Sequence, residues 1–125
     1  RGMNVFLFLG ALNGFLSVAL GAFGAHVLEG RISDHYISTW QTGVQYEMFH
    51  AAALLVVGIL ISKFPSSSLL SWSGWLFLIG IILFSGSLYV LSVTGIKVFG
   101  AITPIGGVSF LVAWMLLMVA ASKLF

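Results

Sequence analysis

The chain has 125 residues, of which 60% are hydrophobic and 6% are charged, and its mean hydropathy is +1.15. A water-soluble domain of this length cannot bury so much apolar surface, so the composition excludes a soluble protein and predicts a lipid environment. The net charge of +2 forms no basic cluster, which argues against a nucleic-acid partner, and the lack of cysteine excludes disulfides and thiolate metal sites.

Four apolar stretches predict membrane-spanning helices, at approximately residues 3–25, 42–62, 69–93 and 104–122. Each is close to the length of about 20 residues that crosses the hydrocarbon core of a bilayer. Backbone polar groups in lipid need partners within the same segment, so each span is expected to be helical. The four spans are predicted to form one domain over residues 3–125, and residues 1–2, before the first methionine, are interpreted as a remnant of an expression vector.

The polar connections carry signals for where the helices end and begin. Pro65 in the turn at 63–68 prevents the second helix from continuing. Asp34, in the long connection after the first span, is a candidate cap for an early start of the second helix. Thr103 is the predicted cap of the fourth helix, with Pro104 as its first helical residue.

An even number of spans places both termini on one side of the membrane, so the predicted fold is an all-α, up-down-up-down four-helix bundle. Lys and Arg are divided equally between the two sides, and the acidic residues Glu29 and Asp34 favour termini in the cytoplasm. Small residues let membrane helices approach closely. The first span has a stripe of them, which is also a candidate homo-oligomer contact. The predicted packing positions are Gly10, Gly14, Ser17, Gly21, Gly24, Gly80 and Gly106.

Glu47 and His50 lie one helical turn apart in the second span, at predicted depths of about 8 and 12 Å below the nearer interface. A carboxyl group in hydrocarbon needs a partner, and His50 can hydrogen-bond to it. Polar residues of all four spans are expected at a similar depth, in one half of the bundle, while the other half is expected to be almost purely apolar. The candidate binding residues are His26, Tyr46, Glu47, His50, Ser85, Ser87, Tyr89 and Thr103.

This cluster permits three interpretations. It can lock the helices in register and have no ligand. It can form a small polar site that binds or conducts a solute, a proton or a lipid headgroup, with Glu47 supplying charge and His50 and His26 exchanging protons. It can also bind metal, since Glu-x-x-His is half of a di-iron motif. Such sites need about four carboxylates, however, and this chain has three acidic residues, two of them in a loop.

The sequence gives little support for an enzyme. No serine stands in a nucleophile-elbow pattern, and the glycine pairs do not join a strand to a helix as phosphate loops do. We therefore expect a non-enzymatic membrane protein without a metal or cofactor, surrounded by the lipid bilayer, whose small-molecule ligand is unknown. A structural or accessory protein is the alternative.

Four ordered motifs resemble the DUF 423 family of small bacterial inner-membrane proteins, and together they cover all four spans. The resemblance implies a multi-pass protein of the bacterial cell membrane with four spans, and it implies no activity. It also places His26, Tyr46, His50, Ser85, Ser87, Tyr89 and Pro104 at motif positions. The motifs are Gly21-Ala22-Phe23-Gly24-Ala25-His26, Trp40-x-Thr42-Gly43-x-x-Tyr46-x-x-x-His50, Phe84-Ser85-Gly86-Ser87-Leu88-Tyr89 and Thr103-Pro104-Ile105-Gly106-Gly107.

Overall fold

The computed structural model describes residues 3–125, and the interpretation of residues 1–2 lies outside the described residues. Its regular elements are all helices, and each of the four rods they form is long and apolar enough to cross a membrane. The prediction of an all-α protein with four membrane-spanning helices is therefore confirmed. The elements are α1 (Val5–Leu28), α2 (Asp34–Lys63), α3 (Ser68–Gly80), the π-helical segment η1 (Ile81–Ser85), α4 (Gly86–Thr94) and α5 (Val98–Leu124).

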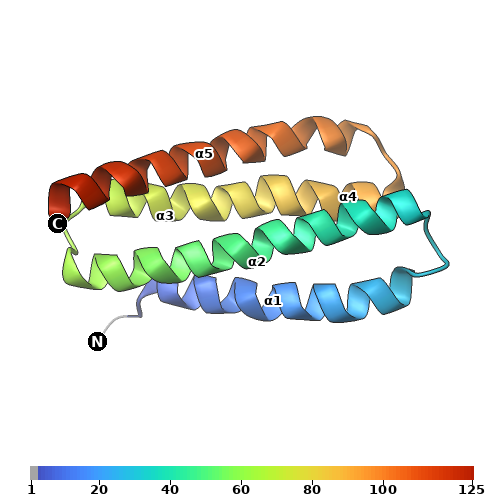
Figure 1. The fold of residues 1–125 in the computed structure, drawn as a ribbon, viewed down its shortest axis with the longest axis horizontal. Helices are drawn as coiled ribbons and strands as arrows, with labels where there is room; N and C mark the ends of the chain where they lie inside the picture. The colour runs from blue at the N-terminus through green and yellow to red at the C-terminus, as the bar shows by residue number, and fades with distance from the viewer. Residues whose placement is uncertain (1–2) are drawn as a thin grey trace.

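The rods lie side by side along the long axis of the molecule, and α3, η1 and α4 together make the third rod (Figure 1). Successive rods run in opposite directions, so the start of α1 and the end of α5 lie at the same end. The α1 helix packs on α2, α2 packs on the third rod, and the third rod packs on α5. The connections at the opposite end are short turns, one of which uses Gly95 with a φ of +70°.

Two helices begin earlier than their apolar stretches do. The Ser33 side chain accepts a hydrogen bond from the Tyr36 amide and caps α2, so Asp34 is the first helical residue and not the cap. The prediction that α5 begins at Pro104 is wrong, because the helix begins at Val98 and contains both Thr103 and Pro104. Proline in a helix removes one amide donor and strains the previous turn, but it does not oblige a helix to start there.

Small residues lie where the rods approach most closely. A Cβ atom added to Gly10 would lie 2.8–2.9 Å from Leu55, and one on Gly21 would lie 3.1 Å from Val44, so this stripe of α1 faces α2. The third rod and α5 meet at Gly80, which faces the Phe110 ring, and at Gly106, whose missing side chain lets the Phe84 backbone approach.

The remaining predicted packing residues lie in the first rod. Gly24 packs against the Trp40 ring. Ser17 is fully buried and donates to the Gly14 carbonyl at 2.9 Å, whereas a Cβ on Gly14 would meet open space. The apolar core lies between α2, the third rod and α5, with Phe6 of α1 inserted into it.

Candidate functional site

The predicted polar cluster divides into two separate groups. In the first, the Tyr89 hydroxyl of α4 donates to the Glu47 carboxyl of α2 at 2.7 Å, and only 4% of Glu47 is exposed. Glu47 and His50 do not bond to each other, contrary to expectation, because Glu47 bonds to Tyr89 and both ring nitrogens of His50 have other partners. Glu47 therefore faces α4, whereas His50 faces α5.

His50 is held on both ring nitrogens. Its Nδ1 lies 2.8 Å from the Tyr46 carbonyl oxygen, and the Trp114 indole N–H donates to its Nε2 at 3.0 Å. A carbonyl can only accept and an indole N–H can only donate, so this geometry requires a neutral imidazole with its proton on Nδ1. The ring also stacks on Phe110, with centroids 3.6 Å apart and planes 8° from parallel.

The predicted serines bridge rods. Ser85 donates to the Gly43 carbonyl of α2 at 2.7 Å. The Ser87 hydroxyl lies 2.6 Å from that of Thr103 on α5. These bonds tie the third rod to both of its neighbours. His26 is exposed near the end of α1 and does not join either group.

Glu47 and His50 lie far from both ends of α2. They follow Asp34 by 13 and 16 residues, which places them about 20 and 24 Å from the start of a 30-residue helix. They therefore lie near the middle of α2. The depths of about 8 and 12 Å below the interface, counted from residue 42, stay a prediction, because the turns of α2 before that residue are mostly polar.

The half of the bundle nearer the termini also carries polar side chains, contrary to the expectation of an apolar half. Ser73 donates to the Ala113 carbonyl at 2.8 Å, and Asn4 donates to the Gly58 carbonyl at 2.8 Å. Both join neighbouring rods. Because their partners are backbone carbonyls, a sequence pattern of paired polar side chains could not reveal them.

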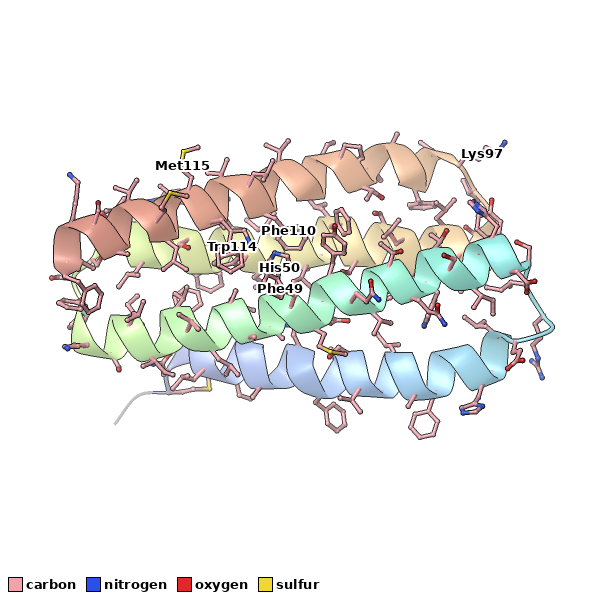
Figure 2. All side chains as sticks on the ribbon, viewed as in Figure 1. Phe49, His50, Lys97, Phe110, Trp114 and Met115 are labelled. Carbon is pink, nitrogen blue, oxygen red and sulfur yellow. The ribbon has the colours of Figure 1, made fainter. Side chains whose placement is uncertain are left out.

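A groove of about 630 Å³ lies between α2 and α5, beside His50. Figure 2 shows Phe49, His50, Phe110 and Trp114 gathered between these two helices. Phe49 is 62% exposed and Leu111 is 69% exposed, so the groove opens on the side of the bundle and not at its ends. Its lining residues are Gln45, Tyr46, Phe49, His50, Phe84, Pro104, Gly107, Val108, Phe110, Leu111 and Trp114.

Local features of the sequence build this groove. The π-helical turn of η1, closed by the bond from the Gly86 amide to the Ile81 carbonyl, brings the Phe84 ring to its floor. Gly107 lines the groove without a side chain, and a Cβ there would have its nearest neighbour, Phe84, at 3.9 Å. Since α2 and α5 each pack on the third rod, side chains span the space between them.

Sequence reasoning missed most of the groove. The lining residues Phe49, Phe110 and Trp114 are not among the binding residues predicted from the sequence. The spacing of Phe110 and Trp114, four residues apart in one helix, is a signal that both side chains share a face. It does not show that the face meets His50.

A family model described as "Protein of unknown function (DUF423)" matches residues 20–107. The chain belongs to the DUF423 family. The resemblance found in the four motifs is thereby confirmed. Glu47, His50 and most groove residues lie inside the matched region, whereas Phe110 and Trp114 follow it.

Curated members of bacterial origin are similar over nearly the whole chain. The UPF0382 membrane protein YwdK of Bacillus subtilis (strain 168) is 55% identical over 97% of this chain and 98% of its own length. A UPF0382 membrane protein of Staphylococcus aureus (strain bovine RF122 / ET3-1) is 51% identical over the same shares. No solved structure gives a significant match. The DUF423 protein is a membrane protein, in agreement with its four apolar rods.

Proposed function

We propose that this DUF423 protein is a non-enzymatic binding protein, which holds an amphiphilic molecule dissolved in the membrane. The observation that carries the proposal is the groove between α2 and α5, whose volume of about 630 Å³ is typical of small-molecule sites. Its mouth lies at the middle of the spans, where hydrocarbon surrounds the protein. A ligand can therefore enter from the bilayer without crossing water.

The lining suits a molecule that is mainly apolar. Aromatic rings form most of the wall, and its polar groups are few: those of Gln45, Tyr46 and His50 on α2 and the indole N–H of Trp114 on α5. Few, well-placed polar groups in an apolar pocket fix the orientation of a ligand. This arrangement favours an apolar body with one polar substituent over an ion or a highly hydrated solute.

A structural role is the second candidate for part of the predicted cluster. Glu47 does not line the groove, and its bond to Tyr89 joins α2 to α4. Within residues 3–125, every buried polar side-chain atom has a hydrogen-bond partner. We therefore assign Glu47 and the bridging serines to holding the rods in register, and His50 and Tyr46 to the groove.

We also propose that the protein lies in the bacterial inner (cell) membrane with its termini in the cytoplasm. Its curated relatives are bacterial membrane proteins, and Glu29 and Asp34 lie at the opposite end from the termini. Since the chain has no cysteine, single cysteines placed at Ser122 or Gly30 allow labelling from each side of intact cells. The predicted homo-oligomer remains a proposal. Gly10, Gly21 and Gly24 of the stripe on α1 pack on α2 within the chain and so are not free to contact a second copy.

Photolabelling of the full chain in lipid nanodiscs tests binding. The probe is an alkyl-substituted phenyl diazirine, and modified residues are mapped by mass spectrometry. We expect labels concentrated at 45–50 of α2 and 104–114 of α5. Even labelling along all lipid-facing helices, α1 included, would refute the proposal.

A pair of glycine variants makes this test specific. Gly107→Leu projects a side chain into the groove and should abolish the concentrated labelling. Gly14→Leu is the matched control, since it adds the same side chain in open space on α1 and should leave labelling unchanged. Equal labelling of both variants would show that the probe binds elsewhere.

A further inference from the structure

The groove contains a hydrogen-bond acceptor whose role is fixed by the backbone. The Tyr46 carbonyl accepts a hydrogen bond from the Nδ1–H of His50, so Nε2 carries a lone pair and is an acceptor. Nε2 points toward α5, and its partner there is the indole of Trp114, which also lines the groove. An acceptor and a donor of the groove lining are therefore bonded to each other, 3.0 Å apart, and a ligand group can insert between them when the two rings move apart.

A hydroxyl group is chemically matched to this pair. Its hydrogen can be donated to Nε2 of His50 while its oxygen accepts the N–H of Trp114, so insertion replaces one bond by two. An ether or a ketone oxygen can accept from Trp114 but leaves Nε2 without a donor. An unpaired polar atom in an apolar site is costly, so these groups are disfavoured.

The surroundings of the pair favour a hydroxyl carried by an aromatic ring. Phe49 lies 5.7 Å from the Trp114 ring, and both side chains line the groove. The Tyr46 ring, which is 42% exposed, lies 4.4 Å from Phe84. Offset and edge-to-face contacts at such separations stabilise ring pairs beyond the burial of area.

Resting on the proposed function, we propose that the groove selects phenol-type amphiphiles, whose hydroxyl inserts between Nε2 of His50 and the indole N–H of Trp114. The ring then lies among the aromatic side chains of the groove. The alkyl chain leaves through the mouth between Phe49 and Leu111, which are both exposed. Without a ligand the indole N–H of Trp114 bonds to Nε2 of His50, and with a phenol bound it bonds to the phenol oxygen.

Three competitors of the photoprobe test this selectivity with the full chain in nanodiscs. They are 4-nonylphenol, its methyl ether 4-nonylanisole, and 1-nonanol, which has a hydroxyl and no ring. We expect the phenol to compete about tenfold more strongly than the ether, as expected when one extra hydrogen bond is made in an apolar site. Equal competition by the phenol and the ether would overturn the inference. Competition by 1-nonanol as strong as that by the phenol would overturn it too.

Variants assign the selectivity to the pair. His50→Phe keeps a stacking ring but removes the acceptor, so the advantage of the phenol over the ether should disappear while binding of the ether persists. His26→Phe makes the same exchange at an exposed position of α1 outside the groove and should retain the advantage. A phenol preference that survives in His50→Phe would refute the assignment.

The comparison of phenol and ether needs only the natural chain, so it stands even if His50→Phe fails to fold. Failure of the inference is also distinguishable from failure of the proposed function. Concentrated groove labelling without phenol selectivity would overturn the inference alone. Diffuse labelling would overturn both.

Discussion

The adjacent residues Gly106 and Gly107 of α5 should respond in opposite ways to one added methyl group. A Cβ on Gly106 would press on the backbone amide of Phe84 and lie 2.8 Å from its Cα atom, where ordinary contacts are 3.4–4 Å. The two rods must then separate by several tenths of an ångström. Backbone cannot rotate away as a side chain can, so Gly106→Ala should destabilise the protein by about 1–3 kcal/mol.

Gly107→Ala is the matched control. Its Cβ would lie 3.9 Å from the Phe84 ring, an ordinary contact, and alanine is favoured over glycine inside a helix by about 0.5–1 kcal/mol. The variant should be as stable as the natural chain or slightly more so. The two substitutions should thus differ by about 1.5–4 kcal/mol at the extremes of these ranges.

Unfolding in mixed micelles with increasing SDS, followed by circular dichroism, measures this difference. We expect the midpoint for Gly106→Ala to fall well below that of the natural chain, and the midpoint for Gly107→Ala to match or exceed it. Equal midpoints would show that α5 and the third rod do not approach backbone to backbone. A lower midpoint for Gly107→Ala alone would reverse the assignment of the two faces.

Four further substitutions probe the bonds between rods, three of them in the same assay. Tyr89→Phe leaves the Glu47 carboxyl without its donor and should cost about 1–3 kcal/mol, whereas Glu47→Gln keeps an acceptor for Tyr89 and should cost less; equal costs would argue against this bond. Ser73→Ala removes the second hydrogen bond of a carbonyl of α5 that keeps its helical bond, so a loss of about 1 kcal/mol in stability is expected. No loss would show the bridge to be unimportant. Trp40→Phe removes the hydrogen-bond donor to a carbonyl of α1 and should loosen that helix. Amide exchange should become faster in α1 than in the natural chain, with a smaller change in α5, and unchanged exchange in α1 would contradict the contact.

Hydropathy predicts the four spans well because twenty consecutive apolar residues have one stable solution in lipid. The predicted start of α5 at Pro104 is wrong because proline is common at the first position of a helix. The apolar residues before Pro104 are equally able to form helix, and the helix includes them. The π-helical turn of η1 has no sequence signature of its own. It depends on the contacts of the third rod with both neighbours.

The ionisable members of the predicted cluster stand out in the sequence, but their bonding partners and the aromatic lining of the groove do not. Glu47 and His50 attract attention because ionisable groups are rare in spans, and the structure buries both. Their partners, Tyr89 and Trp114, lie 42 and 64 residues away along the chain. Helical periodicity says which residues share a face, but only the packing of the rods decides which faces meet.

A crystal structure of the protein grown from lipid with 2-bromo-4-nonylphenol would test occupancy of the groove most directly, since bromine is located by its anomalous scattering. We expect the bromine peak between α2 and α5, with the phenol oxygen within hydrogen-bond distance of both Nε2 of His50 and Nε1 of Trp114. A peak on the outer surface of α1, or a groove filled by a helix of a second copy while His50 and Trp114 stay bonded, would contradict the proposed function.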